Sequence, residues 1–133
     1  MEDPSARALF EAARAAMANS YSPYSGFPVG AAVLTPDGAI YSGCNVENAA
    51  YPQSWCAETT ALAHMVAAGG RRVLEVAVIA EKADRVTPCG GCRQKLMEFG
   101  TADTKVHLCD QTGVVETVTL GALLPMAFDL DSL

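Results

Sequence analysis

The sequence is poor in basic residues: nine Lys and Arg stand against fifteen Asp and Glu, so the formal net charge of the 133 residues is −6. Binding to nucleic-acid phosphates or to an anionic membrane surface requires clustered positive charge. Apolar runs near the ~20 residues of a membrane span are also missing, and the chain begins Met1-Glu2-Asp3, acidic where a signal peptide is basic. We therefore expect a cytoplasmic protein with neither nucleic acid nor membrane as a partner.

An even set of cysteines, which a disulfide framework would need, is absent as well. The chain has five cysteines and two histidines. An odd count without a secretory signal fits a reducing compartment, where closely spaced cysteines are metal ligands or redox thiols. Cys44 and Cys109 have no partner motif, and we expect them to be buried thiols. His64 and His107 stand alone and are interpreted as structural.

The length and the 50% hydrophobic content are those of one domain, residues 1–133, with a single apolar core. Apolar periodicity and turn residues predict helices over 4–19, 55–69, 91–99 and 120–124, and strands over 29–35, 39–43, 73–80, 104–109 and 114–119. The alternation in the middle predicts parallel neighbours, and the short links near both ends predict antiparallel hairpins. The predicted fold is α/β: a three-layer α-β-α sandwich with a mixed five-stranded sheet.

Two motifs carry the chemistry: Cys56-Ala57-Glu58 and Pro88-Cys89-Gly90-Gly91-Cys92. Both lie at predicted helix starts, where free N–H groups and the helix dipole stabilise thiolates. Ligands of α/β proteins gather at one sheet edge, so the three thiolates can converge on one Zn²⁺. Three protein ligands leave a fourth position open, which is typical of a catalytic zinc. Glu58 can reach that open side without being a ligand. Buried core thiols and, for Glu58, a solvated helix-start carboxylate are the alternatives.

These motifs resemble those of the cytidine deaminase superfamily, in which His- or Cys-x-Glu is followed by Pro-Cys-x-x-Cys. The resemblance runs from about residue 19 to residue 128. It includes an entrance loop (20–32), a ribose-binding segment (43–49) and the segments 92–94 and 123–128. The length of the chain, 133 residues, is similar to that of the small homotetrameric, three-Cys branch of this superfamily.

The resemblance implies zinc-dependent hydrolytic deamination of cytidine and deoxycytidine in pyrimidine salvage, with one Zn²⁺ per chain. Glu58 would then be the catalytic residue and Cys56, Cys89 and Cys92 the ligands. The implied substrate-binding residues are Asn45 and Glu47 for the ribose hydroxyls, Phe27 beside the pyrimidine, the backbone of Ala57 at the base edge, Tyr51 near subunit contacts, and Phe128 donated by a neighbouring subunit.

The chain departs from the family at one position beside the motif. Many three-Cys relatives have Arg where this chain has Thr59, and that Arg offsets the excess negative charge of three thiolates. We expect helix dipoles and Arg93 to take over this role. Two other functions stay open: deamination of a different small substrate, such as a modified cytosine or a nucleoside antibiotic, and a structural zinc or thiol-redox module built on Cys89-x-x-Cys92.

Overall fold

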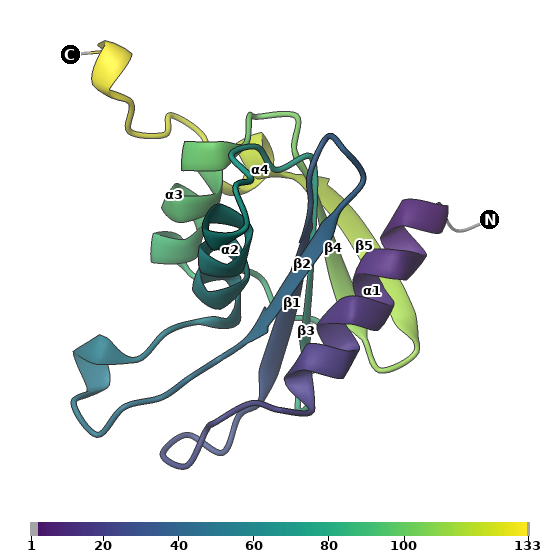
Figure 1. Ribbon diagram of the computed structural model, residues 1–133, viewed down its shortest axis with the longest axis vertical. Coiled ribbons are helices and arrows are strands. Elements are labelled where there is room, and N and C mark those ends of the chain that lie inside the picture. Colours follow the sequence, from purple (N-terminus) through teal and green to yellow (C-terminus); the bar gives the residue numbers. More distant parts are fainter. Residues whose placement is uncertain (1–2, 133) are drawn as a thin grey trace.

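Figure 1 shows the computed structural model of the chain, which describes residues 3–132. Its centre is a five-stranded sheet of order β2-β1-β3-β4-β5. The strands are β1 (Val29–Leu34), β2 (Ile40–Cys44), β3 (Glu75–Ala80), β4 (Lys105–Asp110) and β5 (Gly113–Thr119). The helices are α1 (Pro4–Met17), α2 (Ala57–Ala67), α3 (Gly90–Phe99) and α4 (Leu120–Leu123), with 3₁₀ turns η1 (Tyr51–Gln53) and η2 (Leu130–Ser132). Because α1 covers one face and α2 and α3 the other, the predicted three-layer sandwich is confirmed.

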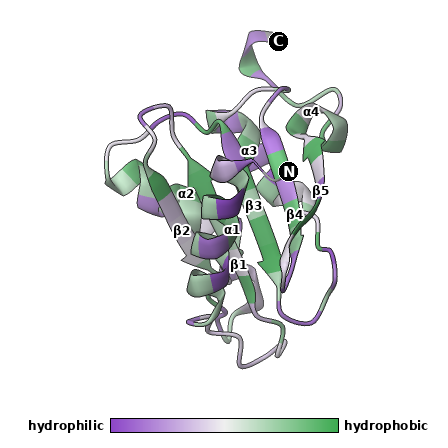
Figure 2. Cartoon of the chain, turned by 90° about the vertical axis from the view of Figure 1, so that its right-hand side faces the viewer, coloured by the Kyte–Doolittle hydropathy of each residue, from purple (hydrophilic) through white to green (hydrophobic). Residues whose placement is uncertain are grey.

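Each face of the sheet has its own apolar core. Along β1 the side chains alternate: Ala31 and Val33 pack with α2, whereas Ala32 packs with α1. The core under α1 is centred on Leu9 and Phe10, both 0% exposed. Figure 2 shows hydrophobic colour on the central strands and hydrophilic colour on the outward side of α1. Burial on both sides therefore explains why the central strands are almost continuously apolar.

The start of α1 follows from local sequence. Asp3 caps the helix by accepting a hydrogen bond from the Ser5 backbone N–H at 3.2 Å, and Pro4 occupies the first helical position. A capping carboxylate and a proline with its fixed φ both favour this start. The predicted beginning of the helix is confirmed, and the helix ends two residues before the predicted Asn19.

In the middle of the sheet, the predicted parallel pairing is confirmed for β3 and β4 and is wrong for β2 and β3, which are not neighbours. Only β3 and β4 pair in parallel among the described strands, whereas β1 pairs antiparallel with both β2 and β3. The expectation of parallel neighbours overlooked that the first hairpin folds back and places β1 between β2 and β3. Strands β2 and β3 still run in the same direction, so the helices that follow them, α2 and α3, begin at the same end of the sheet.

Two glycines allow the helices to lie close to the sheet. A Cβ on Gly30 would lie 2.0 Å from the Ala13 carbonyl oxygen of α1. A Cβ on Gly43 would lie 2.5 Å from the Ala61 backbone nitrogen of α2. Real Cβ atoms do not approach backbone atoms this closely, so any larger residue would push the helix outward. Gly43 thereby fixes the height of α2, and with it the residues at the start of that helix.

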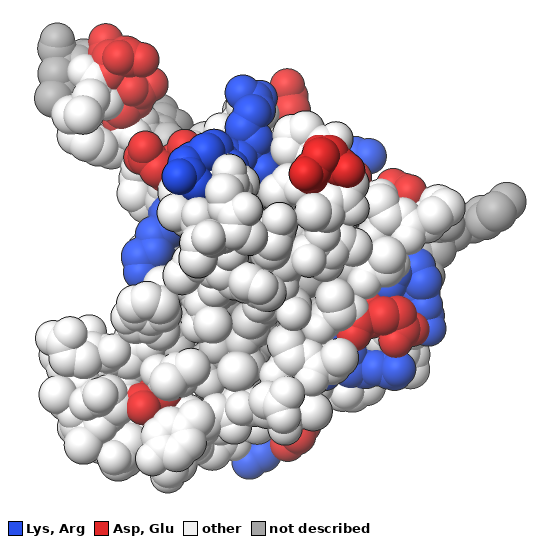
Figure 3. Space-filling model, in the orientation of Figure 1, with Lys and Arg blue, Asp and Glu red and all other residues white. Residues whose placement is uncertain are grey.

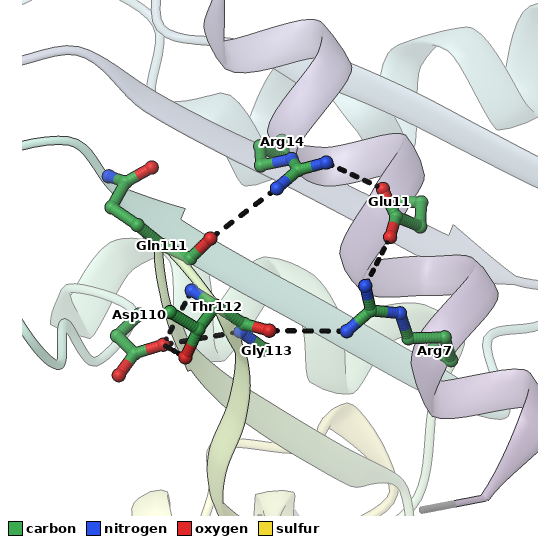
Figure 4. A network of polar contacts seen from close by, with 7 residues as sticks. All are labelled: Arg7, Glu11, Arg14, Asp110, Gln111, Thr112 and Gly113. Atoms are coloured by element: carbon green, nitrogen blue, oxygen red, sulfur yellow. Dashed lines mark hydrogen bonds and ion pairs between the residues drawn. The ribbon is translucent and has the colours of Figure 1, made fainter.

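The surface differs between the two ends of the molecule. Figure 3 shows that the lobe built by residues 20–28 and 45–55 is almost free of charge on this face, whereas most charged side chains lie along the top and the right-hand side of the view. Figure 4 shows how exposed charges tie α1 to the turn between β4 and β5. Arg7 and Arg14 both pair with Glu11, and they donate to the carbonyls of Thr112 (3.1 Å) and Gln111 (3.4 Å). Within the described range, no helix combines the length and apolar character of a membrane span.

Candidate active site

Three cysteine thiols converge where α2 and α3 begin. Cys56 is the N-cap of α2, Cys89 is the N-cap of α3, and Cys92 lies in the first turn of α3. Their Sγ atoms all lie within 4.8 Å of one another, and those of Cys56 and Cys89 are 3.9 Å apart. The predicted helix beginning at Trp55 starts two residues late because Trp55 instead bonds Val46 in an isolated bridge, its N–H donating at 2.8 Å.

The donor set fits zinc. Tetrahedral thiolates about 2.3 Å from Zn²⁺ lie about 3.8 Å from one another, close to the observed separation of Cys56 and Cys89. Among the described residues, neither histidine and neither of the other two cysteines, Cys44 and Cys109, belongs to this cluster. The His107 imidazole contacts Glu75 at 2.7 Å and Thr117 at 2.8 Å, and His64 contacts the Ser42 carbonyl at 3.2 Å. Three soft ligands without a fourth fit one Zn²⁺ per chain with an open coordination position.

The electrostatics of the thiols favour a negative charge on one of them. A hydrogen bond with Cys92 lowers the pKa of the Cys56 thiol to about 6, with smaller contributions from Cys89 and from the nearby positive charge of Lys95. The same bond raises the pKa of Cys92, and burial adds to this effect. Because zinc binds the thiolate form, the lowered pKa of Cys56 favours metal binding and the raised pKa of Cys92 opposes it, which makes zinc affinity pH-dependent.

Glu58 is a buried carboxyl in the first turn of α2, only 4% exposed. Desolvation raises its pKa from the ordinary 4.5 to about 7; its own backbone N–H opposes the shift, and negative charge on Cys56 adds to it. A carboxyl that titrates near neutral pH can both take and give a proton under physiological conditions. Glu58 therefore has the properties of a general acid–base group beside the three thiols.

A cavity of about 430 Å³ lies beside the cysteine cluster and Glu58. Cys56, Cys89 and Glu58 line it, and so do four of the predicted substrate-binding residues: Phe27, Asn45, Glu47 and Ala57. The cavity is also lined by Trp55, Val86 and Thr87, which were not predicted from the sequence. The position of Trp55 beside a ligand was a signal that could have indicated it, whereas Val86 and Thr87 lie in a loop without a distinctive pattern.

Asn45 holds the entrance loop in place. Its Oδ1 accepts from the Val29 backbone N–H at 2.9 Å and from the Ser20 hydroxyl, and its Nδ2 donates to the Phe27 carbonyl at 3.0 Å. Glu47 accepts from the backbone N–H groups of Tyr24 (2.9 Å) and Ser25 (3.0 Å) and from the Ser25 hydroxyl.

The bonds to Glu47 also set its charge. Those from Ser25 hold the pKa of the Glu47 carboxyl below its ordinary value, so that it is an ionised acceptor. The two polar side chains of the predicted ribose-binding segment, Asn45 and Glu47, are thus fixed at the cavity by their hydrogen bonds to the entrance loop.

Tyr51 and Phe128 lie outside the cavity of their own chain. They are 70% and 62% exposed, and neither lines the space beside the thiols. The Tyr51 ring packs edge-on against Tyr24 with 5.7 Å between centroids, and Phe128 lies in the segment after α4 that projects away from the sheet in Figure 1. A role for either residue in substrate binding stays a prediction.

Arg93 contacts backbone and hydroxyl oxygens rather than the thiols. Its guanidinium donates to the Pro88 carbonyl at 2.7 Å, the Leu123 carbonyl at 2.9 Å and the Thr87 hydroxyl at 3.3 Å. The side chain thus fastens the loop that precedes Cys89. We expected Arg93 to offset the charge of the thiolates, but among the described residues its guanidinium has no hydrogen bond to a cysteine sulfur.

Known proteins resemble this chain over nearly its whole length. Residues 4–108 match the family model of the cytidine and deoxycytidylate deaminase zinc-binding region. Cytidine deaminases of Sporosarcina psychrophila and Halalkalibacterium halodurans are 44% and 43% identical over 125 residues, which cover 94% of this chain and 92% and 95% of those proteins. The crystal structure of cytidine deaminase from Burkholderia pseudomallei has a TM-score of 0.85 at 47% identity, covering 91% of this chain and 97% of that one. The chain belongs to the cytidine and deoxycytidylate deaminase family.

Proposed function

We propose that the protein is a zinc-dependent cytidine deaminase that converts cytidine and deoxycytidine to uridine and deoxyuridine with release of ammonia. The observation that carries the proposal is the position of Glu58: a buried carboxyl with a pKa near 7 that shares one cavity with Asn45, Glu47 and two of the three converging cysteines, Cys56 and Cys89. The cytidine deaminases that resemble the chain over most of its length support the same substrate.

Cys56, Cys89 and Cys92 would hold the metal through their Sγ atoms. When bound, zinc acidifies a water molecule and so supplies the nucleophile at neutral pH. The N-terminal dipoles of α2 and α3 favour the thiolate form of these ligands, because each helix begins at a ligand. Arg93 keeps the loop before Cys89 in place through its bond to the Pro88 carbonyl.

Glu58 would move protons at two stages of the reaction. It accepts a proton from the attacking water and delivers that proton to N3 of the ring. It then accepts the second proton, from the hydroxyl now on C4, and delivers it to the leaving exocyclic amine. A bond forms between the water oxygen and C4, and the bond between C4 and the amine nitrogen breaks, so that cytidine and water give uridine and ammonia. General acid–base catalysis contributes about 10²–10⁴-fold to rate, and a group that acts at several steps contributes at the upper end of that range.

The nucleoside would be held by residues that line the same cavity. The Glu47 carboxylate accepts hydrogen bonds from ribose hydroxyls, and the Asn45 amide completes the ribose site. Phe27 provides an apolar wall beside the pyrimidine. Ala57 is the first residue of α2, so its backbone N–H has no partner within the helix and can donate to the edge of the base.

We further propose that residues 1–133 form one catalytic domain that assembles into a homotetramer and serves cytoplasmic pyrimidine salvage. The exposure of Tyr51 and Phe128 supports assembly, because two large aromatic side chains outside their own cavity are available to a neighbouring subunit. Light scattering measures the assembly, and specific activity should fall on dilution below its dissociation constant. A dilute monomer with full activity would refute shared sites.

The test of the activity is the ultraviolet absorbance of the cytosine chromophore. Purified protein is incubated with cytidine, deoxycytidine and free cytosine, beside a zinc-stripped sample. We expect loss of the chromophore with the two nucleosides only, and no loss after stripping. The matched control is Glu58→Gln, which should retain one zinc per chain and lose turnover.

The other outcomes separate the alternatives. Zinc-loaded protein that leaves both nucleosides intact would move the substrate to a modified nucleoside. Freshly purified protein without zinc, and with a reversible disulfide between Cys89 and Cys92, would favour the thiol-redox module. Substantial turnover by zinc-loaded Glu58→Gln would contradict the role of Glu58.

A further inference from the structure

We propose that Lys95 and Thr59 act together as positioning residues that offset the negative charge of the zinc ligand Cys92. In this arrangement the Thr59 hydroxyl donates to the Cys92 thiolate, and the Lys95 ammonium donates to the Thr59 hydroxyl. The inference rests on the zinc site proposed above. It assigns to two residues of this chain a role that the expected residue, Arg93, does not fill.

The contacts form a continuous chain between the two helices. The Thr59 Oγ1 lies 3.9 Å from the Cys92 Sγ, and the Lys95 Nζ lies 2.9 Å from the same Oγ1. Thr59 comes three residues after Cys56 and Lys95 three residues after Cys92, a spacing that places side chains on one helix face. One of the pair therefore comes from each of the helices that supply the zinc ligands.

The direction of the hydrogen bonds follows from the groups involved. A lysine ammonium can only donate, so Oγ1 of Thr59 must accept from Lys95. The hydroxyl proton of Thr59 then remains for another acceptor, and the Cys92 sulfur is the acceptor within range. A hydroxyl that is polarised by a cation donates more strongly than an isolated one. The positive charge of Lys95 thus reaches the thiolate through one hydroxyl group.

The zinc site needs such a charge. Three thiolates around one Zn²⁺ carry a net charge of minus one, and Cys92 is the most buried of the three, at 1% exposed. Arg93 directs its guanidinium to the Pro88 and Leu123 carbonyls, away from the sulfur atoms. Hydrogen bonds from surrounding residues orient metal ligands and tune the metal, and their loss typically lowers metal affinity by about 10–100-fold.

The test measures how fast zinc leaves the holoenzyme. Zinc-loaded protein is mixed with a chromogenic chelator, and the rate of zinc transfer is followed at constant pH and salt. Lys95→Met removes the charge and keeps the apolar stem, and Thr59→Val removes the hydroxyl and keeps the shape. We expect each variant to speed zinc transfer by about tenfold. Lys95→Arg and Thr59→Ser keep the donors and should restore the native rate.

Two comparisons make the result specific. Lys105→Met removes an exposed lysine at the start of β4 and should leave the transfer rate unchanged. In the double variant Lys95→Met/Thr59→Val the increase in the transfer rate should fall well short of the product of the two single effects, because Lys95 acts on Cys92 through the Thr59 hydroxyl.

Three outcomes would overturn the proposal. They are zinc transfer at the native rate in Lys95→Met, zinc transfer by Lys95→Arg as fast as by Lys95→Met, and fully additive effects in the double variant. If the wild-type protein holds one zinc per chain while these results are found, the inference fails and the proposed function stands. A wild-type protein without zinc would overturn both.

Discussion

The buried Glu58 carboxyl should make the zinc-free protein less stable at high pH, and Glu58→Gln should remove that penalty. In the folded chain desolvation raises the pKa of Glu58 from 4.5 to about 7. The folded state therefore binds this proton more tightly than the unfolded state does. The resulting stability is complete below the unfolded pKa and is lost as the pH rises through the folded one.

The size of the effect follows from the two pKa values. Each pKa unit corresponds to about 1.4 kcal/mol. Relative to strongly acidic pH, Glu58 therefore lowers the free energy of unfolding by about 3 kcal/mol at about pH 8, where it ionises in both states, and by about 1 kcal/mol at about pH 5, where it ionises only in the unfolded state. Glutamine has nearly the same shape and does not titrate. Between these pH values, the stability of Glu58→Gln relative to wild type should rise by about 2 kcal/mol, whatever constant offset the amide introduces.

The assay is urea unfolding of zinc-stripped wild type and Glu58→Gln, with a thiol reductant present, at both pH values. Because the other titrating groups are common to both proteins, the change in their stability difference isolates Glu58. A difference that stays constant between the two pH values, or that shrinks toward alkaline pH, would refute the desolvation argument. Agreement would show that the group proposed for proton transfer lowers the stability of the unloaded fold.

Three further predictions concern the surroundings of this carboxyl. Gly43→Ala should lower the free energy of unfolding by about 2 kcal/mol and reduce kcat, because the added Cβ would meet the Ala61 backbone 2.5 Å away; urea unfolding and steady-state kinetics measure both. Ser25→Ala should raise KM for cytidine about fivefold with little change in kcat, since Glu47 loses a hydroxyl that orients it. Zinc at about one hundred times its Kd should raise the free energy of unfolding of stripped protein by about 2.7 kcal/mol, and calorimetry with and without metal checks this.

The sequence predicted the elements of the fold better than their pairing. Turn residues such as Pro36-Asp37-Gly38 marked the first hairpin, and Asp3-Pro4 marked the start of α1, because both signals are local. The neighbour of β1 on its other side depends on where the hairpin inserts into the sheet, which is a long-range packing choice. Alternation of strands and helices therefore predicted parallel neighbours, whereas the structure has an antiparallel β1–β3 pair.

Some features of the site could be predicted from the sequence and others could not, for the same reason. The convergence of Cys56, Cys89 and Cys92 could be predicted because each thiol is tied to a helix start, and helix starts gather at one end of the sheet. The contact between Lys95 and Thr59 could not be predicted, because the two residues lie on different helices and their contact depends on how α2 and α3 pack. Arg93 was the natural candidate in sequence, being adjacent to Cys92, yet its side chain turns toward the preceding loop.

The depth of Glu58 depends on residues outside both motifs. Cys56-Ala57-Glu58 supplies the groups, but their height above the sheet is set by the contact of α2 with β2 at Gly43. A larger residue at that position would move α2 outward, expose Glu58 to water and lower its pKa toward the ordinary value, while the motif itself stayed intact. The same shift would separate the thiols of Cys56 and Cys89, because Cys56 caps α2 and Cys89 caps α3. The geometry of this site thus depends on a glycine that does not line the cavity.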